Sequence, residues 1–216
     1  MERPHVILNA GMTLDGKISS KAYDSRISCP EDLKRVHEIR KGVDGIMVGI
    51  NTVLIDDPRL TVHKVENKGK NPTRIIVDSR ARIPLSARVF KEDGGTIIAM
   101  SRNVDQKKVE EIKSKAEVII CGDEKVDLKR LMEKLYQRGL KSILLEGGGT
   151  LNWGMLEEDL VDEVRVAITP RIVGGKDATT LVEGEGFSLI EEGPKLQLKR
   201  HYLLGDDLIL EYDVIR

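Results

Sequence analysis

Three short stretches of this 216-residue chain combine residue types that could bind a charged or polar ligand. The first is the run Gly147, Gly148 and Gly149, which follows a predicted strand ending at Glu146. Glycines let backbone amides approach a phosphate closely, and a helix that begins near Thr150 would add partial positive charge. The spacing matches neither the G-x-G-x-x-G nor the Walker pattern, so a phosphate cradle and an ordinary loop both stay open.

The second stretch, residues 78–82, is Asp-Ser-Arg-Ala-Arg and follows another predicted strand. Open α/β sheets bind ligands where their strands end. The hydroxyl of Ser79 and the guanidinium groups of Arg80 and Arg82 could there hold a 2′-phosphate, which would favour NADPH over NADH. The alternative is a solvated basic turn.

The third stretch lies at 51–61, where Asp56 and Asp57 stand side by side before Pro58. The proline ring fixes the backbone directly after the two carboxylates. The carboxylates could hydrogen-bond a polar ligand, and the alternative is that they cap a turn.

Other reactive residue types form no recognisable site. The four histidines, at positions 5, 37, 63 and 201, lack metal-ligand spacing, and no zinc pattern is present. Serines and cysteines lack the context of a nucleophile elbow. Metal and hydrolytic chemistry therefore have no support, and His37 is predicted at the surface or boundary of an amphipathic helix.

The elements that must position these residues follow an α/β pattern, in which short β-branched runs alternate with amphipathic stretches. Two C-terminal strands flank a turn at Gly205 and Asp206, which predicts an antiparallel hairpin. The predicted sheet is therefore mixed, parallel in the middle with an antiparallel edge. In chain order the strands are expected at 6–9, 45–50, 73–78, 96–100, 117–121, 142–146, 163–168, 196–204 and 207–214.

Helices are predicted between the strands. Ser28 and Glu31 form a capping-box pattern, which precedes an apolar stripe at 33, 36 and 39 and a C-terminal stop at Gly42. Residues 51–52 are predicted as a polar turn. In the stretch 105–116, Val109 and Ile112 are expected to face inward. A later helix is expected to be capped by Asp127 and to end at Gly139, with apolar residues at 128, 131, 132 and 135.

Composition narrows the class of protein. Lys and Arg total 35 against 36 Asp and Glu, so the basic excess of a nucleic-acid binder is missing. Cys29 and Cys121 form no C-x-x-C pair, which favours a reducing compartment. No apolar run is long enough to span a bilayer, and no signal peptide is recognisable. We therefore expect a cytoplasmic protein that forms one domain over residues 1–216.

Taken together, the sequence resembles the reductase family of riboflavin biosynthesis, which includes free-standing archaeal and fungal enzymes and the C-terminal domain of bacterial bifunctional proteins. The matching blocks follow the family's order across nearly the whole chain. They are NAGMTLDGKI at 9–18, VGINTVLIDDPRLT at 48–61, RIIVDS at 74–79, EGGGTLN at 146–152 and TPRIVGG at 169–175.

The resemblance implies a dihydrofolate-reductase-like three-layer fold, NADPH as cofactor, and a homodimer. It also implies an oxidoreductase that reduces the ribosyl group of a pyrimidinone ribosylamine 5′-phosphate to a ribityl group. The cofactor performs the redox step, while the protein positions the two carbons and excludes water.

The family's functional positions carry over to residues of this chain. The resemblance implies that Asp56 and Glu146 act in catalysis, and that Asn9, Arg40 and Leu60 bind the substrate. It implies a cofactor site formed by Thr52, Asp56, Ser79, Arg80, Arg82, Gly147, Gly148, Gly149, Thr150 and Leu151. Arg40 is a natural phosphate partner, and Glu146 would hydrogen-bond ribose hydroxyls or assist proton transfer.

Two positions depart from the bacterial members, which usually carry Lys where Asn9 stands and Arg where His63 stands. The zinc-deaminase signature of the bifunctional proteins is also missing from this sequence. A free-standing reductase resembles the archaeal and fungal type, so the expected substrate is 2,5-diamino-6-ribosylamino-4(3H)-pyrimidinone 5′-phosphate.

Two alternatives stay open. One is a dihydrofolate-reductase-like enzyme acting on another heterocycle, and the other is a non-catalytic NADPH-binding module. The C-terminal strands, with apolar Leu208, Leu210 and Tyr212, could pair across two subunits or complete one subunit's sheet.

Overall fold

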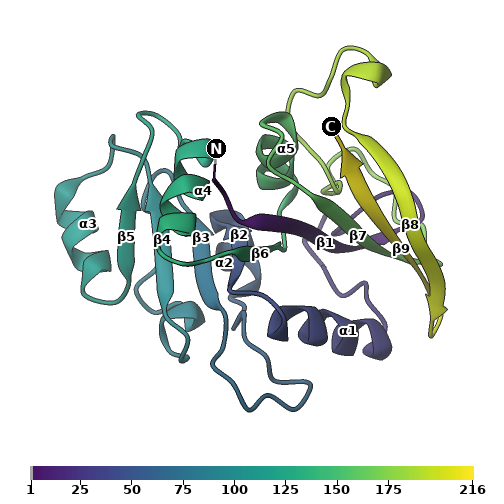
Figure 1. The fold of residues 1–216 in the computed structure, drawn as a ribbon, viewed down its shortest axis with the longest axis horizontal. Helices are drawn as coiled ribbons and strands as arrows, with labels where there is room; N and C mark the ends of the chain where they lie inside the picture. The colour runs from purple at the N-terminus through teal and green to yellow at the C-terminus, as the bar shows by residue number, and fades with distance from the viewer. Residues whose placement is uncertain (1) are drawn as a thin grey trace.

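One nine-stranded sheet forms the centre of the molecule (Figure 1). A computed structural model of the chain describes residues 2–216. The strands lie in the order β5-β4-β3-β2-β6-β1-β7-β9-β8. They are β1 (His5–Thr13), β2 (Gly45–Gly49), β3 (Thr73–Val77), β4 (Thr96–Met100), β5 (Glu117–Ile120), β6 (Ser142–Leu145), β7 (Glu163–Thr169), β8 (Lys195–Leu204) and β9 (Asp207–Ile215).

Every neighbouring pair from β5 to β7 is parallel, whereas β9 runs antiparallel to both β7 and β8. The predicted mixed sheet with a C-terminal hairpin is therefore confirmed. Of the two arrangements left open for the hairpin, β9 completes the sheet of its own chain, and β8 is the exposed edge strand.

Helices cover both faces of the sheet and make three layers (Figure 1). The strands are apolar on both faces because both are buried, as expected for a parallel sheet. One face packs against α1 (Pro30–Lys41), α2 (Ile50–Asp56) and α3 (Gln106–Lys113), and the other packs against α4 (Leu128–Gln137) and α5 (Gly149–Glu157). Two short 3₁₀ turns, η1 (Arg88–Phe90) and η2 (Ile190–Glu192), lie in the connections.

The helix predictions for α3 and α4 are confirmed. Val109 and Ile112 are buried on α3, and the Asp127 side chain accepts a hydrogen bond from the amide of Arg130 at the start of α4. The buried stripe of α4 packs on the sheet because its apolar residues recur at helical spacing. Within residues 2–216, every helix is too short or too polar to cross a membrane.

Four predictions about α1 and α2 are wrong, including that for His37 on the buried face of α1. The N-cap of α1 is Cys29, whose Sγ accepts the amide of Asp32 at 3.4 Å. Pro30 takes the first helical position, so the helix begins one residue later than the expected capping box of Ser28 and Glu31 requires. Leu33 is exposed rather than buried. Residues 51–52 lie inside helix α2 instead of a turn, since the helix begins directly where β2 ends.

The buried face of α1 is polar, which explains why the predicted apolar stripe is wrong at Leu33. Asp32 and His37 are buried. The prediction of a surface or boundary position for His37 is therefore wrong. The side chains of Arg35 and Arg40 are only 11% and 12% exposed. At its start, the helix is tied to the hairpin by a 3.0 Å hydrogen bond from the amide of Cys29 to Asp207 Oδ2.

Candidate active site

The carboxyl ends of β3, β2 and β6 lie next to one another at one edge of the sheet, because these three strands are parallel and adjacent. The segments that leave these ends are residues 78–82, 50–56 and 146–151. The amide of Gly49 donates to the carbonyl of Gly147 at 2.8 Å. A Cβ built on Gly148 would lie 3.6 Å from Oγ1 of Thr52. The three stretches singled out in the sequence therefore share one edge of the molecule.

The glycine run forms a tight turn into helix α5. Gly147 and Gly148 have φ values of +83° and +35°. Residues other than glycine rarely adopt this backbone conformation. The first internal hydrogen bond of the helix runs from the amide of Asn152 to the carbonyl of Gly148 at 3.0 Å. The amides of Gly149, Thr150 and Leu151 precede it, so they have no acceptor within the helix and suit an anion.

A later segment, residues 178–183, covers this turn. The amide of Glu183 donates to the carbonyl of Gly149 at 3.1 Å, and Nδ2 of Asn152 donates to the carbonyl of Leu181 at 2.8 Å. A Cβ on Gly149 would approach Cγ of Glu183 to 2.5 Å and the carbonyl oxygen of Thr180 to 2.7 Å. Position 149 therefore has no room for a Cβ atom, because the covering segment packs directly against the backbone there.

The loop after β1 holds that covering segment in place. The Asp15 carboxylate accepts hydrogen bonds from the hydroxyl of Thr13 and the amides of Val173 and Gly174, which lower its pKa to about 2. Nζ of Lys17 donates to the carbonyl of Ala178 at 3.0 Å. Reasoning from sequence missed these contacts, although the matching blocks at 9–18 and 169–175 contain the residues on both sides.

The stretch after β3 contains one buried charged residue, Asp78, and two exposed ones, Arg80 and Arg82. Asp78 is fully buried, and this burial raises the pKa of its carboxyl, while hydrogen bonds from nearby amides such as that of Ile83 lower it. Oγ of Ser79 accepts the amide of Val126 at 3.0 Å. Arg80 and Arg82 are exposed, and Nε of Arg82 lies 3.9 Å from Oδ1 of Asp78, so this edge of the sheet carries two guanidinium groups of which one is paired with the buried carboxylate.

Asp56 and Asp57 have different roles. Asp57 adopts a left-handed conformation at the end of α2, and its Oδ1 accepts the amide of Arg88 at 2.8 Å, so it caps the turn. Asp56 is exposed and its only hydrogen bond within residues 2–216 comes from Oγ of Ser25 at 3.3 Å. Partial desolvation raises the pKa of the Asp56 carboxyl, against the effect of this hydrogen bond.

Glu146 and Arg40 form a bidentate ion pair at the end of β6. Nε and Nη2 of Arg40 lie 2.7 and 2.6 Å from the two carboxylate oxygens, and both side chains are 12% exposed. Burial lowers the pKa of Arg40, but the Glu146 carboxylate more than offsets this and raises it above the usual value. Nη1 of Arg40 also donates to the carbonyl of Thr61 at 3.0 Å, so one guanidinium group joins β6, α1 and the loop after α2.

The remaining candidate substrate residues lie near this pair. Asn9 is 5% exposed, and its Oδ1 accepts a 2.9 Å hydrogen bond from Nη2 of Arg35. Leu60 has a φ of +52° and is 2% exposed, because its side chain packs into the core below the loop. In this structure Leu60 therefore presents almost no surface to a ligand.

Two histidines hold the loop that follows Leu60 against α1. Nδ1 of His37 accepts the amides of His63 and Lys64 at 3.0 and 3.3 Å. The two imidazole rings meet edge to face with centroids 4.4 Å apart. Burial, together with the positive charge of Arg40, lowers the pKa of His37 to about 3.

We expect this buried histidine to make the fold sensitive to acid. An unfolded histidine titrates near 6.5, so between about pH 6.5 and 3 the unfolded chain binds a proton that the folded chain excludes. The contribution is fully present above pH 6.5 and is lost as the pH falls. His37→Asn keeps an acceptor and removes the titration, so the free energy of unfolding of the unmodified protein should fall relative to this variant, by on the order of 2 kcal/mol between pH 7 and 4.

Urea unfolding at both pH values measures this difference. The control is His201→Asn, which changes an exposed histidine on β8. A difference between the unmodified protein and His37→Asn that stays constant with pH would show that His37 does not titrate as its surroundings indicate.

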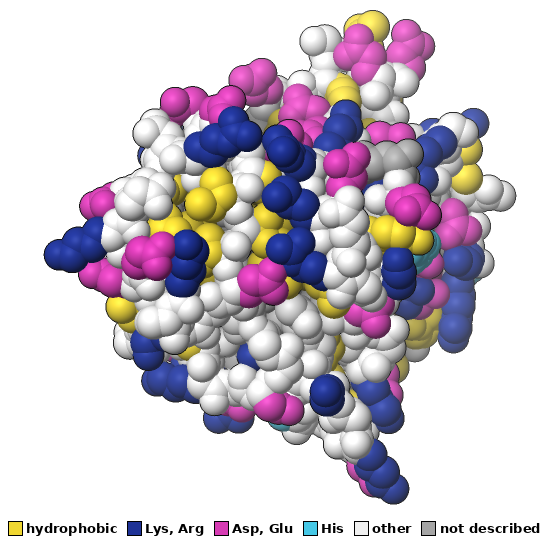
Figure 2. All heavy atoms as spheres, turned by 60° about the vertical axis from the view of Figure 1, so that its left-hand side comes forward, with side chains coloured by type: hydrophobic (Ala, Val, Ile, Leu, Met, Phe, Trp, Pro, Cys, Tyr) yellow, Lys and Arg dark blue, Asp and Glu magenta, His cyan; other side chains and the backbone are white. Residues whose placement is uncertain are grey.

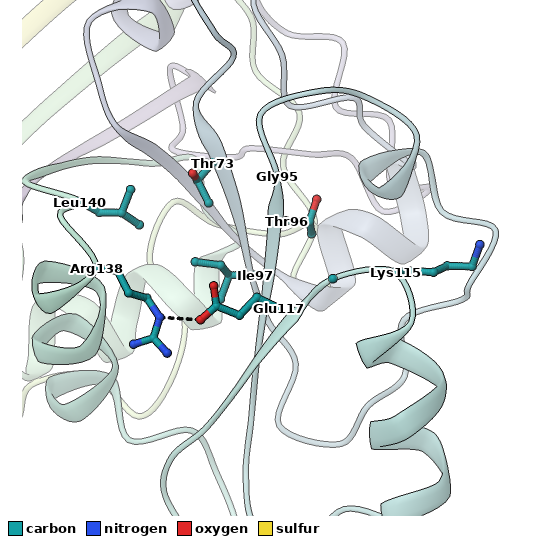
Figure 3. Close-up of a pocket in the computed structure, with 9 residues that line it drawn as sticks. Thr73, Gly95, Thr96, Ile97, Lys115, Glu117, Arg138 and Leu140 are labelled. Atoms are coloured by element: carbon teal, nitrogen blue, oxygen red, sulfur yellow. Dashed lines mark hydrogen bonds and ion pairs between the residues drawn. The ribbon is translucent and has the colours of Figure 1, made fainter.

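A cavity of about 390 Å³ lies at the opposite edge of the sheet, where β3, β4 and β5 begin (Figure 3). Its polar lining includes Thr73, Thr96 and an ion pair between Arg138 and Glu117 at 2.6 Å. The side of the molecule that carries α3 and β5 shows basic, acidic and hydrophobic side chains intermixed (Figure 2). The lining of this cavity contains none of the candidate site residues, so the cavity is separate from the site.

The three-layer fold and its polar edge define a dihydrofolate-reductase-like protein. The structure of dihydrofolate reductase from Enterococcus faecalis matches this fold with a TM-score of 0.57 at 10% identity, covering 98% of this chain and 97% of that chain. The chain belongs to the RibD C-terminal domain family, whose model matches residues 4–210.

Two relatives lie closer in sequence. The 2,5-diamino-6-ribosylamino-4(3H)-pyrimidinone 5′-phosphate reductase of Methanothermobacter thermautotrophicus is 54% identical over 213 residues, which cover 98% of this chain and 99% of the relative. The structure of a diaminohydroxyphosphoribosylaminopyrimidine deaminase/5-amino-6-(5-phosphoribosylamino)uracil reductase from Thermotoga maritima is 26% identical, with a TM-score of 0.80, and covers 99% of this chain and 57% of that chain.

Proposed function

We propose that this chain is the reductase of riboflavin biosynthesis that converts 2,5-diamino-6-ribosylamino-4(3H)-pyrimidinone 5′-phosphate to its ribitylamino form with NADPH. The observation that carries the proposal is the Arg40–Glu146 ion pair beside the glycine turn, at one edge of a dihydrofolate-reductase-like sheet. The full-length similarity to a reductase named for this substrate supports the same reaction.

The glycine turn fits a dinucleotide. The helix-start amides of Gly149, Thr150 and Leu151 would bind the pyrophosphate together with Gly147 and Gly148, because a glycine backbone leaves room for the phosphate oxygens. When bound, NADPH supplies the hydride that reaches C1′ of the sugar. This chain's own contribution is to hold the two reactants in line and to keep water out.

The choice of NADPH over NADH rests on the stretch after β3. Ser79, Arg80 and Arg82 would surround a 2′-phosphate, since both arginines are exposed and guanidinium groups bind phosphate through paired hydrogen bonds. Thr52 and Asp56 lie on α2, which leaves the end of β2 at the same edge of the sheet, and they would line the junction of the nicotinamide and the sugar.

The substrate side of the site would be formed by Asn9, Arg40, Leu60 and Glu146. Arginine has five N–H donors, and Arg40 uses three of them on Glu146 and Thr61. The other two can reach a phosphate or sugar oxygen. Glu146 would accept a hydrogen bond from a ribosyl hydroxyl, and Asp56, whose partial desolvation raises the pKa of its carboxyl, would act in catalysis near the reduced carbon.

A spectrophotometric assay tests the proposal. NADPH absorbance should fall when the ribosylamine phosphate is added, and kcat/KM should be higher with NADPH than with NADH. Consumption of NADPH with dihydrofolate but not with the ribosylamine would contradict the substrate. NADPH binding without turnover of any pyrimidinone would contradict the enzyme and favour a binding module.

We further propose that residues 1–216 form one reductase domain, that the enzyme works in the cytoplasm, and that it is a homodimer. The support for a dimer is the edge strand β8, on which Leu196, Leu198 and Leu203 are 40%, 49% and 74% exposed. An unpaired edge with apolar side chains is a surface that a second copy could cover. The mass in solution, measured by light scattering alongside the assay, tests the assembly.

A further inference from the structure

Helix α1 presents two arginines to neighbouring strands, one at the middle of β1 and one at the end of β6. Arg40 binds Glu146, and Arg35 donates from Nη2 to Oδ1 of Asn9 at 2.9 Å. The ladder between β1 and β6 ends at the pair Leu8 and Leu145. Asn9 is the next residue of β1 and Glu146 is the first residue after β6, so their backbones lie about 5 Å apart.

The two side chains lie on the same face of the sheet. Ile7 and Leu144 pack in the core beneath α1, whereas Leu8 and Leu145 pack on the opposite face. Side chains alternate along a strand, so Asn9 returns to the face of Ile7. A carboxamide and a carboxylate therefore stand side by side, each bound from below by an arginine of the same helix.

The contact with Arg35 fixes which way the carboxamide faces. A guanidinium group only donates hydrogen bonds, so the atom of Asn9 that meets it is the oxygen. Nδ2 of Asn9 then points away from Arg35, and it has no hydrogen-bond partner among residues 2–216 and is not enclosed. The site thus displays an N–H donor from Asn9 next to a carboxylate acceptor from Glu146, which complements two adjacent sugar hydroxyls.

Arg35 is itself held in place. Its Nε lies 2.8 Å from Oδ1 of Asp32, a residue with no exposed surface, and its own side chain is 11% exposed. Nη1 of Arg35 and Oδ2 of Asp32 are enclosed without a hydrogen-bond partner. A buried ion pair whose hydrogen bonds are only partly satisfied adds little stability, which indicates a role other than stabilising the fold.

We propose that Arg35 is a positioning residue of the reductase, which holds the Asn9 carboxamide with Nδ2 turned toward the ribosyl hydroxyls of the substrate. The proposal rests on the proposed function and adds a residue to it. Arg35 acts through Asn9 and makes no contact with the substrate.

The test is a double-mutant cycle on Asn9 and Arg35 in the full chain. Asn9→Ala and Arg35→Gln should each raise KM for the ribosylamine phosphate about tenfold, the effect of one lost hydrogen bond in a site closed to water. Because Arg35 acts only through Asn9, the double variant should be no worse than Asn9→Ala. The dissociation constant of NADPH, measured by fluorescence titration, should stay unchanged in all three variants.

Two more variants separate positioning from packing. Asn9→Asp keeps an oxygen for Arg35 and removes the donor, so KM should rise at least as much as in Asn9→Ala while thermal stability is retained. If Arg35→Gln fails to fold because Asp32 is left buried and unpaired, Asp32→Asn combined with Arg35→Gln takes its place.

If the increases in KM caused by Asn9→Ala and Arg35→Gln multiply in the double variant, the proposal is overturned. An unchanged KM in Arg35→Gln would overturn it as well. Absence of turnover in the unmodified protein would overturn the proposed function as well, and it is measured before any variant is made.

Discussion

Arg40→Met is expected to destabilise the fold by about 3–5 kcal/mol, because it leaves the Glu146 carboxylate buried without a partner. Turnover should be lost at the same time, since Glu146 would no longer be held beside Asn9 and the loop at Thr61 would lose its hydrogen bond from Arg40. Thermal unfolding and the NADPH assay measure the two effects separately.

The double variant Arg40→Met with Glu146→Leu distinguishes structure from chemistry. Replacing both charges with apolar side chains of similar size should restore most of the stability, because no buried charge is left unpaired. Turnover should stay absent, since the acceptor for the sugar hydroxyl is gone. Arg26→Met, which breaks the exposed pair with Asp24, is the control and should leave the melting temperature unchanged. Full activity in the double variant would contradict a catalytic role for Glu146.

Gly149→Ala should weaken NADPH binding about 10- to 100-fold, as expected from an overpacking cost of about 1–3 kcal/mol. The new Cβ would meet the carbonyl oxygen of Thr180 at 2.7 Å and Cγ of Glu183 at 2.5 Å. Because Thr180 contributes backbone, the covering segment or the first turn of α5 must shift, and either shift moves the amides proposed for the pyrophosphate. Fluorescence titration with NADPH measures the loss.

Gly154→Ala is the matched control in the same helix. Its Cβ would approach only Cδ1 of Leu128 at 2.9 Å, the far end of a flexible side chain, and alanine is a better helix former than glycine. NADPH affinity should stay as in the unmodified protein. Equal NADPH affinity in Gly149→Ala and Gly154→Ala would show that the first turn of α5 does not bind the cofactor.

Most of the sheet could be predicted from sequence because its signal is local. The parallel strands are short β-branched runs buried on both faces, and the hairpin is marked by its turn at Gly205. Helix α4 was equally clear, since its apolar residues recur at helical spacing. The shared edge of the three candidate stretches then follows from strand order, which the resemblance supplied and the residues alone did not.

Helix α1 shows where local patterns fail. Its buried face carries Asp32, Arg35, His37 and Arg40, so a search for apolar periodicity selected the exposed Leu33 instead. Arg35, His37 and Arg40 have hydrogen-bond partners distant in sequence, as Glu146 is for Arg40, whereas Asp32 pairs with Arg35 of the same helix. The same limit applies to Asp15 and Lys17, whose partners at 173–178 lie about 160 residues later along the chain.

The hydrogen bond from the amide of Cys29 to Asp207 has a consequence for synthesis in the cell. Its two residues are 178 positions apart, so the start of α1 cannot be anchored until the ribosome has released nearly all of the chain. Before then α1 can be held on the sheet only through its later residues, by the contacts of Arg35 with Asn9 and of Arg40 with Glu146. Contacts of such long sequence separation slow folding, so the start of α1 is expected to be fixed late, together with the C-terminal hairpin.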